Sequence, residues 1–582
     1  MRKSKLFVCA ILLSAISTGN GGPLRGCFAA DEHAQLLTPQ VRRPAALVPH
    51  GDWLLVGNRR SGTVSVVDMA KRRVVAEHRV GEQIADMTPH PGDSAAFVID
   101  GVKHRLLAIK VDADGVAVEA IAEVAPFPTR MIVSEKHRCV FVSSRWSRRV
   151  SIVDFDDRFN KPVRVRQIPL EFPPHELLLI EGQRKLIAAD AFGGRLAVID
   201  VAMADVERVH DLPAHNIRGL ALSFDESTLL LSCQMLASRS WADRDSVHWG
   251  ILLSNAVRGL NVKLLLDPQQ DVVKESWLEK LGLVGRAAGD PGPILIDEKG
   301  RQAVALCGVG EVRINASSYA QTLPVGRRPS AMVSLDNRLF VANQFDDSIS
   351  IIDWPSGTVY EPISLGPPTK LSARDRGELL FYDARLSHDR WMSCHSCHSD
   401  GHTINLLADT LGDGDFGAPK RIPSLLGTKA TGPWAWNGEV KSLDAQVRKS
   451  VRTTMHGGRL SNAQAGDLVA FLESLRPPPS RFAPDAALVS RGRRVFERRS
   501  CIDCHAPPNY TAADTFDVGL RDEAGLQHFN PPSLRGLGQR DIFFHDGRGS
   551  RVEDVIQKNR HQLSEPLSAD EAAALLAFLR SL

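Results

Sequence analysis

The chain has 582 residues, of which 43% are hydrophobic and 24% are charged, and its formal net charge is +3. A single hydrophobic core stops growing well below this length, so we expect a globular protein of two or more domains. The near-neutral charge gives no whole-molecule field that would favour nucleic acid or an anionic membrane, and no nucleic-acid module is found. Partners must therefore be inferred from local sites.

The first 30 residues have the layout of a secretory signal. A basic start precedes an apolar run at 6–16, and small residues follow at Ala29 and Ala30. The run is too short to cross a bilayer, which takes about 20 apolar residues, and no later segment is long enough. We expect residues 1–30 to be a signal peptide and the mature protein to be periplasmic or otherwise extracytoplasmic, not transmembrane. An uncleaved anchor is the alternative.

A repeated strand pattern occupies residues 40–365. One copy reads 139–142 followed by 150–154, and each second strand is closed by an aspartate, so that Asp154 and Asp200 lie 46 residues apart. That spacing is the length of a four-stranded propeller blade, and the alternation of apolar and polar residues favours strands. The region resembles the YVTN-type β-propeller repeat family. We expect an all-β propeller of about seven blades.

The pattern changes at three places. One blade is interrupted between about 235 and 290 by a stretch that contains His248-Trp249-Gly250 and a helix-like segment at 275–283, which is either a docking loop or a structural elaboration. The Pro/Gly-rich segment near 355–370 is interpreted as a linker. Beyond it, amphipathic helices at 468–475 and 575–582 have nearly the same sequence, so the C-terminal third is a duplication.

Each half of the duplication contains one Cys-x-x-Cys-His motif, and the two motifs are 107 residues apart. In this motif the thiols form thioethers to a c-type haem and the histidine is the proximal iron ligand. A thiol redox pair or a zinc site is the competing interpretation, which two copies in register behind an export signal disfavour. The residues are Cys394, Cys397 and His398 in the first motif and Cys501, Cys504 and His505 in the second. We expect two all-α cytochrome c-like domains, at 372–478 and 485–582.

The segments around these motifs carry a family resemblance. Residues 377–387, 423–425 and 436–438 in the first half, and 532–534 and 544–548 in the second, resemble the bacterial di-haem cytochrome c peroxidase family. That family includes the di-haem enzyme that matures methylamine dehydrogenase. The resemblance implies two covalently bound haem c groups, with a peroxidatic first haem supplied with electrons by the second. Calcium between the two domains is common in the family, but no ligands are assigned for it here.

The resemblance implies roles for two residues near the first haem. Trp436 matches a tryptophan between the haems and is the expected relay, although a buried core residue is the other interpretation. His456 stands 20 residues later, where the family has a distal glutamate that moves protons. A histidine can do this work because its unperturbed pKa is about 6.5. His456 could equally be the sixth iron ligand.

Two expected iron ligands of the family are missing. The displaceable histidine sixteen residues after the first motif is replaced by Gly414, with only His402 nearby. Asn559 stands where the second haem takes a Met or Tyr ligand, so His561 is the stronger candidate. A bis-histidine site would lower the reduction potential relative to His/Met.

These features predict an exported, peroxidase-like di-haem oxidoreductase that reduces peroxide, or activates oxygen, at the first haem. The alternative is a non-catalytic electron-transfer protein whose propeller docks a redox partner, and an open iron position distinguishes the two. The expected partners are a small electron-donor protein or a quinol-linked cytochrome. The propeller could also present a protein or polymer for oxidation.

Overall fold

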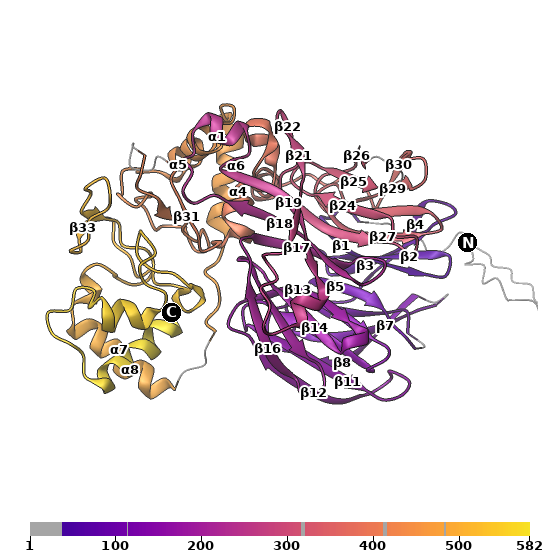
Figure 1. The fold of residues 1–582 in the computed structure, drawn as a ribbon, viewed down its shortest axis with the longest axis horizontal. Helices are drawn as coiled ribbons and strands as arrows, with labels where there is room; N and C mark the ends of the chain where they lie inside the picture. Colours follow the sequence, from indigo (N-terminus) through magenta and orange to yellow (C-terminus); the bar gives the residue numbers. More distant parts are fainter. Residues whose placement is uncertain (1–37, 93, 113–114, 316–319, 411–415, 482–484) are drawn as a thin grey trace, which may run out of the picture.

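The computed structural model describes residues 38–582 except 93, 113–114, 316–319, 411–415 and 482–484. The expected signal peptide at 1–30 therefore lies outside the described residues. Of the helices within these ranges, none is both long and apolar enough to cross a membrane. Figure 1 shows two parts, a body of strands coloured indigo to pink and a helical region in orange and yellow beside it.

The strands form seven four-stranded antiparallel sheets, each built from consecutive strands. The first four sheets are β1–β4 (Pro44–His50, Trp53–Asn58, Thr63–Asp68, Arg73–Arg79), β5–β8 (Ile84–Pro89, Ala96–Asp100, Arg105–Asp112, Gly115–Glu123), β9–β12 (Pro128–Ser134, Cys139–Ser144, Arg149–Phe155, Pro162–Pro169) and β13–β16 (Pro174–Ile180, Lys185–Asp190, Arg195–Asp200, Asp205–Asp211). The others are β17–β20 (His215–Leu222, Thr228–Leu236, Leu253–Asn261, Trp277–Lys280), β23–β26 (Pro291–Ile296, Gln302–Leu306, Glu311–Asn315, Ala320–Pro324) and β27–β30 (Pro329–Leu335, Arg338–Asn343, Ser348–Asp353, Val359–Ser364).

The sheets close into a ring. The first strand of each sheet packs beside the first strand of the next, and β27 packs beside β1. Asp347 of the last blade accepts hydrogen bonds from the backbone N–H groups of Arg42 and Arg43, at 2.9 and 2.7 Å. Ser330 of the last blade donates to the carbonyl of Pro44 at 2.8 Å. The predicted fold class, a seven-bladed β-propeller followed by a helical region, is confirmed.

The aspartate that closes the repeated pattern has a local role. It ends the third strand of a blade and accepts a hydrogen bond from the backbone N–H three residues later. The distances are 2.8 Å for Asp68, 2.8 Å for Asp200 and 3.0 Å for Asp353. Aspartate is favoured in such turns because its carboxylate satisfies the backbone donor of the turn.

The interrupted blade is the fifth, and one expectation there is wrong. The expected helix at 275–283 is instead the strand β20, followed by β21 (Gly282–Leu283), which pairs with β22 (Arg286–Ala287). β20 pairs with β19 and completes the blade, so a tertiary contact overrides the local helical pattern. The linker expected at 355–370 likewise contains β30, the last strand of the ring. The insertion carries the short helix α1 (Arg244–His248) between β18 and β19, and α2 (Val262–Leu266) follows β19.

The helical region consists of two similar units. The first helical unit contains α3 (Ala373–Phe381), α4 (Cys394–Cys397), α5 (Leu443–Lys449) and α6 (Asn462–Ser474), and the second helical unit contains α7 (Ala486–Arg498) and α8 (Ala569–Ser581). The short elements of this region are η2 (Ala384–Leu386), η3 (His388–Arg390), η4 (Ser399–Gly401), η5 (Ser450–Thr454), η6 (Cys501–Asp503), η7 (Leu537–Gln539) and η8 (Asp554–Lys558), with the strands β31 (Leu407–Ala408), β32 (Lys420–Arg421), β33 (Phe516–Asp517) and β34 (His528–Phe529). The remaining short element, η1 (Glu181–Gln183), lies in the propeller between β13 and β14.

The first and last helices cross closely in both units. At Gly377 of α3 an added Cβ would lie 1.9 Å from the carbonyl oxygen of Asp467, and at Gly492 of α7 it would lie 2.0 Å from that of Ala574. The crossings are also filled by matching aromatic pairs, Phe381 with Phe471 and Phe496 with Phe578, whose ring centroids lie 5.2 and 5.3 Å apart. The sequence duplication is therefore a structural duplication.

Candidate functional site

The first Cys-x-x-Cys-His motif forms α4 and the residue that follows it. Ser393 caps the helix and forms a capping box with Ser396. The His398 Nδ1 donates a hydrogen bond to the carbonyl of Pro423 at 2.9 Å, which leaves the Nε2 lone pair available for a metal. Burial lowers the pKa of His398 to about 4, so the imidazole is neutral at neutral pH, as a ligand must be.

A cavity of about 330 Å³ lies against this motif. Both motif cysteines and His398 line it, and most of the remaining wall is apolar. The apolar lining residues include Phe381, Leu443, Val447, Leu468 and Leu472. A cavity of this kind, with a few polar groups in an apolar wall, is typical of a cofactor site.

Two arginines in this cavity test whether a haem fits. Arg421 is buried and Arg540 is half-buried, and among the described residues neither pairs with a carboxylate. Burial lowers the pKa of Arg421 to about 9 and that of Arg540 to about 10, because no anion compensates the buried charge. The Arg421 Nη1 also lacks a hydrogen-bond partner within the described part of the chain. The two propionates of haem c match these two cations, so the residues present fit the group.

Three further cavity residues were missed by the sequence analysis. Gln446 donates from Nε2 to the Ser450 hydroxyl at 3.1 Å, and its buried Oε1 has no hydrogen-bond partner within the described ranges. Met455, which is buried, adds a thioether to the same cavity. The spacing of Gln446 and Ser450, four residues apart on a helix, would have placed them on one face.

His456 does not line this cavity in the structure. Its Nε2 lies 2.7 Å from the carbonyl oxygen of Ala242 in the propeller insertion. A carbonyl only accepts, so Nε2 carries the proton and Nδ1 keeps a lone pair in the neutral ring. His402, which lies outside the cavity wall as well, packs against Trp146 and Phe192 of the propeller with ring centroids 5.3 and 4.8 Å apart. The role of His456 stays a prediction.

Trp436 lies where the two helical units meet. It lines the first cavity and donates from Nε1 to the Arg421 carbonyl at 2.9 Å. Its ring contacts that of His545 in the second helical unit edge-on, with centroids 6.4 Å apart. Bridges from Trp434 to Val440 and from Phe543 to Gly549 make Trp436 and His545 equivalent positions of the duplication. This location suits the relay role, which remains a prediction.

The second motif resembles the first in its proximal histidine. The His505 Nδ1 donates to the Tyr510 carbonyl at 3.2 Å, and burial lowers the pKa of His505 to about 4. A charge on His561 also lowers the pKa of His505, so the two rings lie within electrostatic reach. Asn559 uses its side-chain donor on the Asp554 carbonyl at 2.9 Å. His561 therefore stays the predicted sixth ligand, and Cys501 and Cys504 the predicted haem attachment residues.

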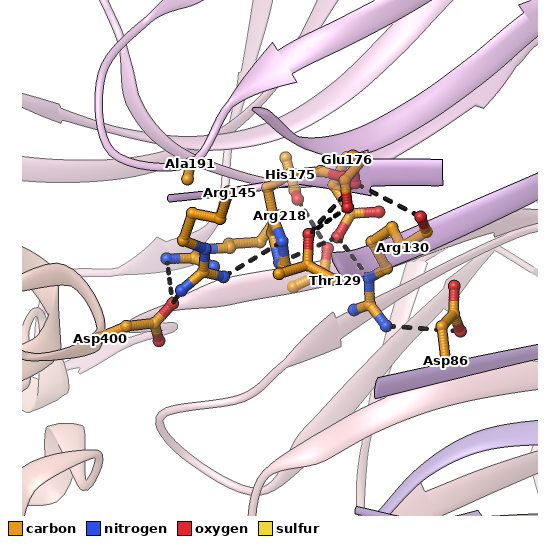
Figure 2. Close-up of polar contacts among 12 residues, drawn as sticks. Asp86, Thr129, Arg130, Arg145, His175, Glu176, Ala191, Arg218 and Asp400 are labelled. Atoms are coloured by element: carbon orange, nitrogen blue, oxygen red, sulfur yellow. Dashed lines mark hydrogen bonds and ion pairs between the residues drawn. The ribbon is translucent and has the colours of Figure 1, made fainter. Parts of the chain in front are cut away.

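A polar network joins the propeller to the segment that carries the first haem motif. Figure 2 shows Arg145 and Arg218 of the propeller directed at Asp400, at 2.8 and 3.0 Å. Burial acts to raise the pKa of Asp400, but the two arginines hold it well below its usual range. Farther into the propeller, Arg130 pairs with Glu176 at 3.1 Å.

Further propeller groups contact the motif itself. His215 and Asn216 donate to the carbonyl of Ser396 at 3.1 and 3.0 Å. Asp290 accepts from the hydroxyls of Ser393 and Ser396. The loop that carries the first pair of cysteines is therefore fixed by the propeller as well as by its own unit.

The comparisons with known proteins agree with these features. Residues 374–479 match the family model for the di-haem cytochrome c peroxidase. The cytochrome c551 peroxidase of Nitrosomonas europaea is 25% identical over 279 residues, which cover 38% of this chain and 83% of that protein. The methylamine utilization protein MauG of Methylophilus methylotrophus is 25% identical over 291 residues, covering 38% of this chain and 85% of that protein. Among solved structures, a chain of Kuenenia stuttgartiensis hydrazine synthase is 17% identical with a TM-score of 0.46, covering 57% of this chain and 99% of that chain.

The family model and the two curated relatives identify a haem oxidoreductase. Residues 374–479 form a domain of the di-haem cytochrome c peroxidase family, placed behind a seven-bladed β-propeller. The family implies haem c with iron as the cofactor.

Proposed function

We propose that the protein is an exported, periplasmic oxidoreductase that reduces hydrogen peroxide, or activates oxygen, in the first helical unit with electrons from the second. The observation that carries the proposal is the hydrogen-bonded Gln446–Ser450 pair in an apolar cavity that also holds His398. A buried acceptor without a protein partner suits a small polar ligand such as a peroxide. When bound, haem c supplies the redox-active iron and its coordination position.

The chain's own residues would hold the haem, orient the oxidant and keep water out of the cavity. His398 presents Nε2 while Pro423 fixes its tautomer, and Arg421 and Arg540 would hold the propionates. The Gln446–Ser450 pair would orient the oxidant, and the apolar wall limits access of water. His456 stays the proposed proton-transfer residue: it lies outside the cavity wall, directly after the lining residue Met455, and Nδ1 is the atom left to take up a proton because Nε2 is directed at the carbonyl of Ala242.

The electron donor is proposed to dock on the second helical unit. Helix α7 ends shortly before Cys501, and its arginines Arg491, Arg493 and Arg494 are exposed. A basic surface beside a redox centre favours an acidic partner, which fits a small electron-donor protein or a quinol-linked cytochrome. A protein or polymer substrate would have to bind parts of the propeller that the first unit does not cover. Calcium between the units stays a prediction without assigned ligands.

Met455 favours the second candidate function, a non-catalytic electron-transfer protein. Its thioether lines the first cavity and could be a sixth iron ligand, which would close the iron to peroxide. The substitution Met455→Leu separates the two functions because it conserves volume and removes the sulfur.

The test is the absorption spectrum of the ferric, haem-loaded protein before and after peroxide. We expect a high-spin component that peroxide converts, and no change of spin state in Met455→Leu. A wholly low-spin wild type that ignores peroxide before and after partial reduction, and that becomes high-spin in Met455→Leu, would overturn the peroxidase proposal.

A further inference from the structure

A cluster outside the cavity at the first haem motif joins the propeller insertion to the first helical unit. It consists of His248, at the end of α1, and His388 and Asp389 of η3, which lie just before the first haem motif. Each side chain offers one ligand atom, and these atoms all lie within 4.8 Å of one another. The proposed peroxidase chemistry uses none of them.

Two imidazole nitrogens approach the same carboxylate oxygen. The Asp389 Oδ2 lies 2.6 Å from Nδ1 of His248 and 3.5 Å from Nε2 of His388. The two imidazole rings lie side by side, with centroids 5.5 Å apart and planes inclined by 34°. Ligands bound at about 2.1 Å from a metal lie at most about 4 Å apart, so a shift of under about 1 Å in the side chains would enclose an ion.

The surroundings suit a metal ion better than a buried ion pair. The three side chains are 35%, 21% and 15% exposed, so water can reach the remaining coordination positions. Among the described residues, the two histidines are the only basic groups paired with Asp389. Two imidazoles and one carboxylate form a donor set that suits zinc and other divalent first-row metals rather than calcium or magnesium.

The two backbones that carry the histidines of the cluster are closely packed against the first helical unit. The Trp391 Nε1 donates to the carbonyl of His248 at 3.1 Å, and the His388 N–H donates to the carbonyl of Met455 at 2.9 Å. At Gly250, φ is +62° and an added Cβ would lie 2.5 Å from the Trp391 ring. The insertion is thus seated tightly on the segment that precedes the first haem motif, and the backbones of His248 and His388 are both held by hydrogen bonds.

The geometry points to a zinc-class metal site formed by His248, His388 and Asp389. It binds one divalent ion per chain and fastens the propeller insertion to the segment before the first haem motif. The bound ion links α1 to the backbone of Met455 through His388. Its loss loosens the insertion without removing any group that lines the haem cavity.

The test is zinc binding by the haem-loaded, EDTA-treated full chain, measured as metal content after dialysis against micromolar zinc. We expect about one equivalent in the wild type and in the control His50→Ala, a propeller histidine outside the cluster. In His248→Ala, His388→Ala and Asp389→Asn we expect at least a tenfold weaker apparent affinity. Asp389→Asn is the sharpest variant because its amide oxygen still accepts from the histidines while the anionic ligand is lost.

A second measurement uses the wild-type protein alone and so does not depend on the folding of a variant. Zinc-edge X-ray absorption of the loaded wild type is unaffected by haem colour, and we expect a first shell of two imidazole nitrogens and oxygens without sulfur. A wild type that takes up less than a tenth of an equivalent overturns the proposal. Equal uptake by wild type and all three variants, or a sulfur shell that places zinc on the cysteines, also overturns it.

Discussion

The two helical units share a fold but differ in what covers them. In the first, His395 and Ser396 of the haem motif are buried, and propeller side chains bond to the backbone of Ser396. In the second, Asp503 of the motif is exposed, and α7 presents a row of arginines beside it. The two units therefore keep the same haem-motif scaffold while their surroundings differ, and this difference supports the proposal that the first unit carries the reaction and the second meets the donor.

Each unit is anchored to the propeller by one aspartate that forms ion pairs with two propeller arginines. Asp400 of the first unit pairs with Arg145 and Arg218. Asp541 of the second pairs with Arg148 and Arg195, both at 2.8 Å. The two anchors differ in whether an arginine has a second carboxylate partner. In the second anchor, Arg195 also pairs with Asp190 at 2.7 Å.

The largest effects should come from removing the proximal histidines. We expect His398→Ala to abolish both the spectral response to peroxide and turnover, by more than about 100-fold, since even groups that merely support a metal ligand are worth about 10- to 100-fold. His505→Ala should reduce turnover equally while the single-turnover response to peroxide persists. Stopped-flow spectra and steady-state oxidation of a reduced donor measure the two quantities.

The opposite pattern would reverse the assignment. If His505→Ala loses the peroxide response and His398→Ala keeps it, the second unit is the reactive one. Unchanged turnover in His505→Ala would mean that electrons reach the first unit by another route.

Neutralising the aspartate should cost more stability in the first anchor than in the second. Asp400→Asn leaves buried Arg145, whose pKa burial lowers to about 10, without its carboxylate, so we expect a loss of about 3 to 5 kcal/mol of stability. Asp541→Asn leaves only Arg148 without a carboxylate, because Arg195 keeps Asp190. Asp400→Asn removes the carboxylate from both Arg145 and Arg218, so the loss expected for Asp541→Asn is smaller, about 1.5 to 3 kcal/mol. Denaturant unfolding followed by haem absorbance measures both, and a larger loss in Asp541→Asn would contradict the comparison.

The pH dependence of the second anchor has a definite sign. Burial acts to raise the pKa of Asp541, but Arg148 and Arg195 lower it below its ordinary value. An acid whose folded pKa is depressed adds stability above its unfolded pKa of about 3.9 and loses it as the pH falls through the folded pKa. The difference in free energy of unfolding between wild type and Asp541→Asn should therefore be constant near neutral pH and shrink below about pH 4.

Local signals explain what the sequence could predict. The propeller was foreseen because Asp68, Asp200 and Asp353 recur at the end of a strand, where each accepts from a nearby backbone N–H. The haem motifs are equally local, since the two attachment cysteines and the proximal histidine lie within five positions. The duplication made both signals stronger.

Long-range contacts explain what the sequence could not predict. Asp400 and Arg145 are 255 positions apart, and only the folded ring brings them together. The expected helix at 275–283 failed because pairing of β20 with β19 outweighs a short amphipathic pattern. The family resemblance implied a distal role for His456, or a place as sixth iron ligand, but nothing local showed that Ala242 of the insertion would lie against its Nε2.

A smaller effect is expected at the helix crossings. Gly377→Ala places a methyl 1.9 Å from the carbonyl oxygen of Asp467, so we expect a loss of about 1 to 3 kcal/mol. Gly466 in α6 has nothing within 4 Å of an added Cβ, so Gly466→Ala should add about 0.5 to 1 kcal/mol. Urea unfolding of the two variants checks the sign, and destabilisation by Gly466→Ala would show that the crossing is not what distinguishes them.

The smallest effect tests the junction between the units. Trp436→Phe removes the hydrogen bond to the Arg421 carbonyl and retracts the ring from His545, so we expect re-reduction of the first unit by the second to slow by about tenfold, or about 1.4 kcal/mol in barrier height. Trp434→Phe is the matched control, because Trp434 lines the same cavity but bonds to Thr428 within its own unit. Rapid-mixing kinetics of the half-reduced protein measure the rate. Equal slowing in both variants would assign the effect to disturbed packing of the cavity, whereas slowing confined to Trp436→Phe identifies the contact with His545 as the route between the units.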